Sequence, residues 1–267
     1  MRRLLALTRA GIIESFQFRL SIAVTIFGNL IYLALVYFLW KAIYDSAGTD
    51  TVGGMTFYDT MIYLVLATAM FNLLEMFFIW EMSRSVQSGE IVMDLLKPMR
   101  YRRYIFWSNS GAYVMHFFLE FIPTFIVVAL ISGGAIPMGM NLLYFMASLI
   151  LALFLNYNFE MLISPICLYT ESTWGVNIVK ETIVLLLSGA MIPLAFFPDW
   201  LRQIVDWLPF RAVYDIPLSI LLEKNGTTDF GTMAMNLGIQ LAWCVVLALA
   251  GNLFWYRAVK KITVNGG

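Results

Sequence analysis

Charge is scarce in this chain of 267 residues, because only 13% of them are Asp, Glu, Lys or Arg while 61% are hydrophobic. Soluble domains carry about 25% charged residues and roughly 45–50% apolar ones. The composition therefore excludes an ordinary soluble domain and indicates an integral membrane protein. The 17 basic and 17 acidic residues balance, so nothing in the net charge suggests a nucleic-acid partner.

Residues that carry covalent or metal chemistry are also few. The chain has one histidine, His116, and two cysteines, Cys167 and Cys244, which lie in apolar surroundings without CxxC spacing. That pattern argues against both a metal site and a disulfide framework. The Gly-Lys dipeptide of a phosphate-binding loop is absent, as are the HExxH and GxSxG motifs. We therefore expect no catalytic residues, no metal site and no cofactor bound by this chain.

Long apolar runs, in contrast, are abundant. A membrane-spanning helix needs about 20 apolar residues, and six runs reach that length: 21–44, 58–80, 105–131, 140–169, 175–196 and 233–256. The connections between them are short and leave no room for a second soluble domain. The sequence predicts an all-α integral membrane protein in which residues 1–267 form one domain of six transmembrane helices.

The basic residues indicate which ends of these spans face the cytoplasm. The N-terminal segment, the loop after the second span and the C-terminal segment hold twelve Lys and Arg residues, against four on the other side. Cytoplasmic segments carry such an excess. We therefore expect a multi-pass protein with both termini in the cytoplasm.

Two further segments are expected to lie along the membrane surface. Residues 1–20 carry four arginines beside an apolar stripe, which predicts an interfacial helix. A simple basic anchor before the first span is the alternative. Residues 198–230, interrupted by Pro209 and Pro217, are expected to form short re-entrant or interfacial helices on the outer side. Trp200 and Trp207 lie seven residues apart, on one helical face suited to lipid headgroups.

The most polar part of the chain is the loop 83–104, which carries five basic residues between two apolar runs. Residues 88–97 are expected to form a short helix that ends at Pro98. At about 100° per residue, Glu90, Asp94 and Lys97 share one face, and apolar residues occupy the other sides. Such a helix suits docking into a groove on another protein. A helix lying on the membrane surface is the alternative.

Four glutamates fall inside predicted spans: Glu75, Glu120, Glu160 and Glu181. A carboxylate inside a span costs roughly 2.5–3.5 kcal/mol, so each is expected to face protein or water. One hypothesis is an acidic vestibule for a cationic amphiphile, with Glu75, Glu120, Glu160 and Asn156 as candidate substrate-path residues. Interhelical hydrogen bonding, with Lys180 among the partners, is the alternative.

Two stretches resemble type-2 ABC exporter permeases. The sequence SGEIVMDLLKPMRY from Ser88 is similar to the signature between the second and third spans of that family. Residues 189–201, followed by Leu208-Pro209-Phe210, are similar to the family's segment after the fifth span, where paired short helices lie on the outer side. The number of spans and the chain length also fit. The resemblance is greatest to a branch with paired permeases that is similar to drug and viologen exporters.

The resemblance implies a role for each of these segments. The loop 83–104 would contain a coupling helix docked on a separate ATPase, with contacts from Gly89, Glu90, Ile91, Asp94, Leu95 and Lys97. ATP and Mg would bind to that partner, present in two copies. A second permease, identical or a related sister chain, would complete the pore. Pro193, Phe197 and Trp200 would form an outer gate.

The function that follows is export of an amphiphilic substrate, such as a drug, an antibiotic or a lipid-like molecule, across a bacterial-type plasma membrane. Membrane lipids would surround the chain, and nucleic acid would not be a partner. One alternative is a secondary transporter driven by an ion gradient that uses the intramembrane glutamates as proton sites. Another is a lipid-modifying membrane enzyme, which the lack of a polar catalytic cluster disfavours.

Overall fold

The computed structural model describes residues 2–17, 19–133, 136–137, 139–170, 173–224 and 229–260. Met1 and Phe18 of the predicted interfacial helix, Lys261 of the basic C-terminal segment and 225–228 of the predicted outer segment lie outside these ranges. The described part is almost entirely helical, with one short hairpin, β1 (Thr51–Val52) paired antiparallel to β2 (Met55–Thr56).

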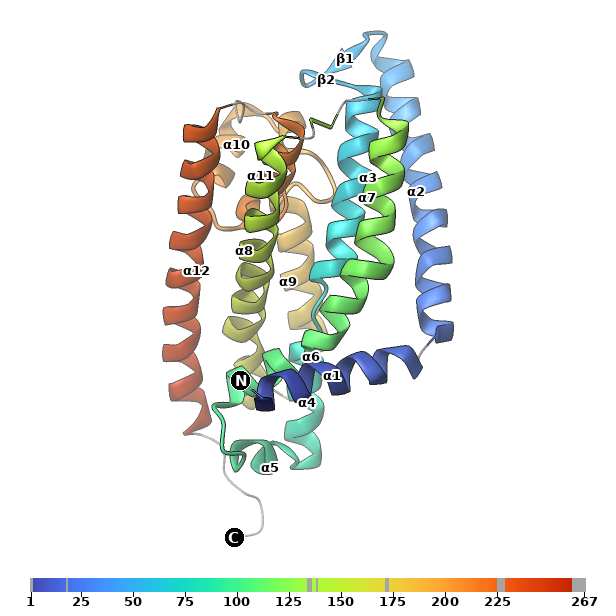
Figure 1. Ribbon diagram of the computed structural model, residues 1–267. Coiled ribbons are helices and arrows are strands. Elements are labelled where there is room, and N and C mark those ends of the chain that lie inside the picture. The colour runs from blue at the N-terminus through green and yellow to red at the C-terminus, as the bar shows by residue number, and fades with distance from the viewer. Residues whose placement is uncertain are drawn as a thin grey trace.

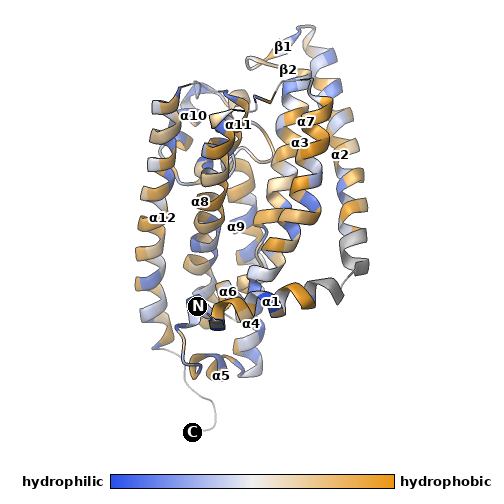
Figure 2. Ribbon diagram, in the orientation of Figure 1, coloured by the Kyte–Doolittle hydropathy of each residue, from blue (hydrophilic) through white to orange (hydrophobic). Residues whose placement is uncertain are grey.

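Within the described residues, five helical segments are long and apolar enough to cross a membrane: Val24–Ala47, Phe57–Ser88, Tyr101–Ile131, Met140–Leu168 and Phe230–Val259. They correspond to the first, second, third, fourth and sixth predicted spans. Their hydropathy is visible along the upright helices in Figure 2. The first of them, within α2 (Arg19–Ala47), stands at the edge of the bundle with little of its surface buried (Figure 1).

The predicted fifth span is shorter than expected. The predicted fifth span, 175–196, is helical only in its first part, because α9 (Trp174–Leu187) has 14 residues and ends before a turn at Gly189 with φ +84°. Its length of about 21 Å is less than the hydrocarbon thickness of about 30 Å. The chain continues through a 3₁₀ turn, η3 (Leu194–Phe196), into α10 (Asp199–Asp206) at the upper end of Figure 1.

The second membrane segment is broken in the middle. α3 (Phe57–Leu74) ends at Glu75, whose backbone is extended (φ −61°, ψ 128°), and α4 (Phe78–Ser88) starts three residues later. A helix end inside a membrane leaves backbone carbonyls without partners. Asn156 supplies one such partner, since its side-chain amide donates to the Leu74 carbonyl.

The third segment contains a π-helical turn. α6 (Tyr101–His116) runs into η1 (Phe117–Phe121) and then α7 (Ile122–Ile131), and the Ile122 N–H donates to the Phe117 carbonyl five residues earlier. Pro123 explains the change, because proline lacks an N–H and its ring collides with the carbonyl four residues back. Turns of this type are frequent at functional sites.

The remaining long helices pack as a pair. α8 (Met140–Ile163), extended by the 3₁₀ turn η2 (Ser164–Leu168), runs beside α12 (Phe230–Val259) (Figure 1). Ser148 donates to Gln240 across this contact at 2.8 Å, and Gln240 donates to the Ala212 carbonyl at 2.8 Å. Ala212 lies in η4 (Phe210–Ala212), which precedes the buried helix α11 (Asp215–Leu222). These bonds hold the outer segment inside the bundle.

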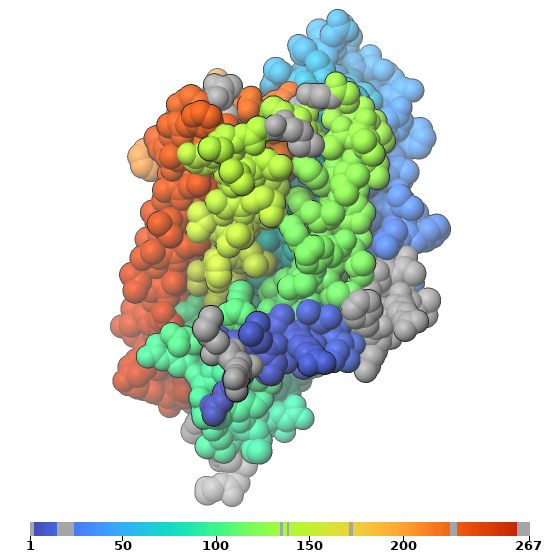
Figure 3. All heavy atoms as spheres, viewed as in Figure 1, coloured from blue at the N-terminus to red at the C-terminus, as the bar shows by residue number. Residues whose placement is uncertain are grey.

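The N-terminal helix α1 (Arg2–Gln17) lies across the lower end of the bundle, roughly perpendicular to the long helices, and covers part of the front face in Figure 3. It crosses α6 at two glycines. A Cβ at Gly111 would overlap the backbone of Gly11 and Ile12, and Thr8 and Ser110 hydroxyls lie 2.6 Å apart beside that crossing. Two glycines permit a backbone approach that any other residue would prevent.

Candidate functional site

The loop 83–104 folds as a compact projection at the lower end of the molecule (Figure 1). α4 ends at Gly89, which adopts the left-handed conformation (φ 78°) and donates its N–H to the Val86 carbonyl. Glycine is the common residue at this position because it has no Cβ. The predicted helix over 88–97 is therefore too long, and the loop contains only the short helix α5 (Ile91–Leu95).

Part of the expected docking surface faces the chain itself. Ile91 is only 2% exposed and belongs to an inner apolar cluster with Met82 and Tyr101. The expectation that Ile91 lies on the docking surface was therefore wrong. Leu95 is half-buried against the same cluster. The reason is the α5 backbone, which turns residues four apart toward the same side.

Asp94 and Lys97 bind each other within the loop. Lys97 Nζ lies 2.7 Å from Asp94 Oδ1 and 3.6 Å from the centre of the Tyr104 ring, and Ser85 donates to Asp94 at 3.4 Å. Burial lowers the pKa of Lys97, but its hydrogen bonds to Asp94 and Tyr104 outweigh this and raise that pKa above its ordinary value. This polar face therefore braces the loop, and Gly89 and Glu90 remain exposed.

The loop also presents two apolar residues that the sequence interpretation did not select. Met93 and Leu96 are 66% and 74% exposed, on the side of α5 away from Ile91. Their apolar character alone did not show that they would be exposed, because apolar residues occur on several sides of α5. Only the direction in which Ile91 is buried separates the inward side chains from the outward ones.

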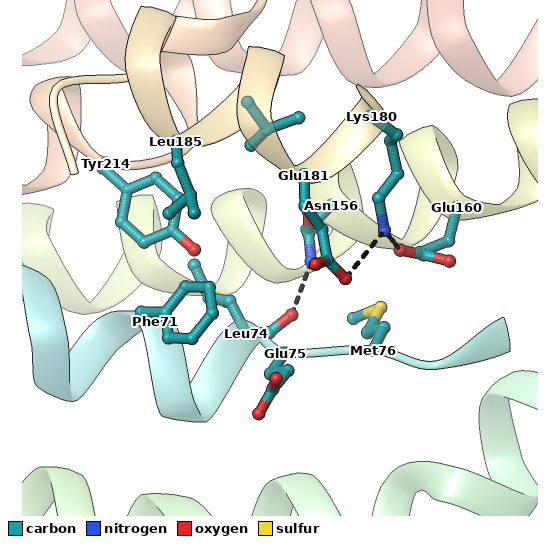
Figure 4. Close-up of a pocket in the computed structure, with 11 residues that line it drawn as sticks. Phe71, Leu74, Glu75, Met76, Asn156, Glu160, Lys180, Glu181, Leu185 and Tyr214 are labelled. Carbon is teal, nitrogen blue, oxygen red and sulfur yellow. Dashed lines mark hydrogen bonds and ion pairs between the residues drawn. The ribbon is translucent and has the colours of Figure 1, made fainter. Parts of the chain in front are cut away.

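The glutamates of the spans fall into different surroundings. Glu160 of α8 is buried and paired with Lys180 of α9, whose Nζ also lies 3.8 Å from Glu181 (Figure 4). Asn177 donates to Glu181 at 2.8 Å. Asn156, Glu160 and Glu75 line one small cavity of about 30 Å³, which has room for about one water molecule. For Glu160 and Asn156 this supports the interhelical hydrogen-bonding alternative.

Glu75 differs from Glu160 although both line that cavity. Figure 4 shows its carboxylate pointing away from Lys180, and none of the described residues gives it a hydrogen bond or an ion pair. On that side lies a second cavity of about 500 Å³, bounded by α1, the α3–α4 connection, α4 and α6. The break in the second segment therefore directs Glu75 into the larger space.

Glu120 does not line the small cavity that Glu75, Glu160 and Asn156 share. It is buried in η1, and its carboxylate is 2.9 Å from His116 Nδ1, one turn earlier. Its second oxygen has no partner among the described residues. His116 itself reaches the wall of the larger cavity. Glu120 is therefore connected to that cavity through His116 rather than by direct exposure.

The three residues predicted as an outer gate differ in their surroundings. Pro193 lines an outer cavity of about 400 Å³ together with Tyr63 of α3 and Asp215 of α11. Phe197 is half-buried after η3, while Trp200 projects from α10 and is exposed, as is Trp207. A gating role for Pro193, Phe197 and Trp200 stays a prediction.

Comparison with models of known protein families identifies the family of this chain. The sequence model of a family described as ABC-2 family transporter protein matches residues 30–266, from the first membrane helix to the C-terminal segment. No curated protein matches the chain.

Among the described residues no group of His, Cys, Asp and Glu could hold a metal ion. Permeases of this kind normally work with an ABC ATPase. The chain belongs to the ABC-2 transporter family and is a membrane permease of an ABC transporter.

Proposed function

We propose that this permease is part of an ATP-driven exporter that moves an amphiphilic drug, antibiotic or lipid-like substrate out of the cytoplasm or the inner leaflet. A separate ATPase, present in two copies, would bind ATP and Mg and drive the cycle. A second permease, either identical or a sister chain, would complete the pore in a bacterial-type plasma membrane. The observation that carries the proposal is the braced inner loop with its exposed apolar tip.

The tip is suited to a protein partner. Met93 and Leu96 are large apolar side chains, and Glu90 lies exposed beside them. An apolar anchor with a charged rim is typical of a protein interface. Because these residues project from the loop, they would enter a cleft on the ATPase without displacing Ile91 from its own chain.

The base of the loop contacts three membrane helices, so a displacement of the tip would be transmitted to these helices. Arg102 donates to Asn158 of α8 at 3.1 Å and to Asn252 of α12, and Tyr157 of α8 donates to the Arg102 carbonyl at 2.6 Å. Tyr101 stacks on Trp255 of α12 with ring centres 4.7 Å apart. Arg102 therefore acts as the joint through which movement of the loop would tilt α6, α8 and α12.

The proposal includes six membrane crossings. α9 would cross with the help of the stretch 188–198, which contains only the 3₁₀ turn η3, since α9 starts near the inner loop and α10 lies at the opposite end (Figure 1). Both termini would then face the cytoplasm. Glu90, Asp94, Lys97 and Gly89 would keep the coupling role implied by the resemblance, Asp94 and Lys97 by bracing the loop.

The tip can be tested by substitution. Met93→Glu and Leu96→Glu are each expected to weaken association with the ATPase by about tenfold, because buried apolar anchors contribute roughly 1–3 kcal/mol each to an interface. The measurement is co-purification of the ATPase from the native membrane, followed by ATP-dependent transport in vesicles. Thr49→Glu in the outer turn serves as the control and should leave association unchanged.

Substitutions in the brace should separate ATP hydrolysis from transport. Asp94→Lys removes the partner of Lys97, and Gly89→Pro cannot adopt the positive φ at the end of α4. Both variants are expected to stay in the membrane with reduced export. Full export and full stimulation of ATP hydrolysis in both would contradict the coupling role. Should no ATPase co-purify and transport follow a proton gradient, the secondary transporter would be the better description.

A further inference from the structure

The cavity of about 500 Å³ at the break between α3 and α4 has a strong charge imbalance. Three carboxylates line it, from Glu14 of α1, Glu75 of the connection and Glu81 of α4, against one guanidinium, that of Arg84. Arg84 is exposed and therefore hydrated. His116 also lines the wall but is engaged with Glu120. The space is thus predominantly negative.

Two of these carboxylates have no partner of their own. Glu81 accepts a hydrogen bond from Asn109 at 3.1 Å, whereas neither Glu14 nor Glu75 has a hydrogen bond or ion pair among the described residues. An unpaired carboxylate within a membrane segment is costly, roughly 2.5–3.5 kcal/mol on insertion scales. Glu160, in the neighbouring cavity, is by contrast paired with Lys180. The carboxyl group of Glu75, which has no hydrogen-bond or ion-pair partner among the described residues, is therefore available for a ligand.

The rest of the wall is aromatic. Phe77, Phe78 and Tyr113 contribute rings, and the faces of such rings attract cations, whereas the Tyr104 ring already holds Lys97 Nζ 3.6 Å from its centre. Tyr113 is only 7% exposed, and its hydroxyl has no hydrogen-bond partner among the described residues. A buried hydroxyl without a partner is a further sign of a missing ligand or water. Phe77 is half exposed, which leaves an opening beside the break.

We infer that this cavity binds an organic cation with an apolar body, held by Glu14, Glu75 and Glu81 and by the aromatic wall. The inference rests on the proposed export function, because it names the chemical class of the substrate that would enter from the inner side. Carboxylates at several positions around one cavity fit a diffuse cationic group, and the rings fit its apolar substituents.

The experiment measures equilibrium binding of radiolabelled tetraphenylphosphonium to the full chain in nanodiscs of neutral lipid, without nucleotide, with empty nanodiscs subtracted. Tetraphenylborate has the same shape and the opposite charge. Each ion is measured in a separate sample, and we expect saturable binding of the phosphonium and none of the borate. Glu14→Gln, Glu75→Gln and Glu81→Gln should each lower affinity by about threefold to tenfold, as expected for one partly screened charge pair.

Asp50→Asn, which removes an exposed carboxylate from the outer turn, should bind as the wild type does, and Glu75→Asp should recover part of the affinity lost in Glu75→Gln. Thermal unfolding of each variant identifies any that fails to fold. Equal binding of the two ions, or unchanged affinity in all three glutamine variants, would overturn the inference. The proposed function fails separately, if no ATPase co-purifies, because the binding measurement requires neither ATP nor a partner.

Discussion

Lys180 and Glu160 show, at the scale of single residues, why a polar group is tolerated inside this bundle. Both side chains are buried and bind each other between α9 and α8. Neither is stable there alone, because removing one partner of a buried ion pair leaves an uncompensated charge and costs about 3–5 kcal/mol. We therefore regard the pair as a structural connection between two helices.

Lys180→Met is expected to lower the free energy of unfolding by about 3–5 kcal/mol, and the double variant with Glu160→Gln should lose clearly less. Chemical unfolding in detergent micelles measures both. Lys41→Met, at an exposed position, provides the control for loss of a lysine. An equal loss in the single and the double variant would mean that the charge of Glu160 is compensated elsewhere.

Asp229 offers a pH-dependent feature outside the membrane spans. It caps α12, where the Thr232 side chain and the Thr232 N–H donate to its carboxylate, and these bonds lower the pKa of Asp229. Because the folded pKa is lowered, the stabilisation is present above the ordinary Asp pKa and is lost as the pH falls through the lowered value. A ¹³C NMR titration of the carboxyl should show this midpoint, and Thr232→Val should move it upward.

The candidate site could be predicted only in part from single residues. The cost of a carboxylate in a membrane singled out Glu75 and Glu160 from the sequence, and in the structure both line one small cavity together with Asn156. The same reasoning overlooked Glu14 and Glu81, because they lie in segments that were assigned to the membrane surface and the loop boundary. Burial and orientation, which place Glu75 between two cavities, depend on the helix break and are not visible in composition.

The predicted helices agree with the structure in their positions along the chain but not in where some of them end. Apolar length predicts that a segment can cross a membrane, and it located the helices that begin near Phe57 and Phe230. The break at Glu75 was not predicted, since no Pro or Gly marks it, and its freed carbonyl is satisfied by Asn156 from a distant helix. The early end of α9 depends on the positive φ of Gly189, a property of backbone conformation that hydropathy does not report.

The close approach of α1 and α6 can be tested by adding a methyl group at Gly111. Thr8→Cys and Ser110→Cys should form a disulfide, because the native hydroxyls lie 2.6 Å apart. Adding Gly111→Ala should reduce the disulfide yield by about tenfold, since overpacking of this kind typically costs 1–3 kcal/mol. Gly28→Ala, where a Cβ meets nothing within 4 Å, should leave the yield unchanged. An unaffected yield in Gly111→Ala would show that α1 moves freely over α6.

At the scale of the whole molecule, the inner loop and the outer hairpin define two opposite ends. Thr49 lies beside the hairpin, Gln203 lies in α10 at the same end, and Gln87 lies near α5 at the other (Figure 1). This arrangement agrees with the distribution of basic residues that predicted the cytoplasmic side. Under the proposed six crossings, the chain would change sides along α9 and the stretch 188–198 that leads to α10.

Single-cysteine variants at these positions test the number of crossings, with Cys167 and Cys244 replaced by alanine. A membrane-impermeant maleimide added to intact cells should label Thr49→Cys and Gln203→Cys and leave Gln87→Cys unlabelled until the membrane is permeabilised. Labelling of Gln203→Cys only after permeabilisation would mean that α9 does not cross, and that the chain has five spans.

The glycine crossing between α1 and α6 has a mechanical consequence for the surrounding lipid. The backbones of α1 and α6 approach each other closely at Gly11 and Gly111. If α6 tilts with the inner loop, as the proposed function requires, α1 would rise or fall with it relative to the lipid headgroups. Work against the inner leaflet would then contribute to the energy of each transport cycle, and the turnover rate should depend on how tightly the lipids of that leaflet are packed.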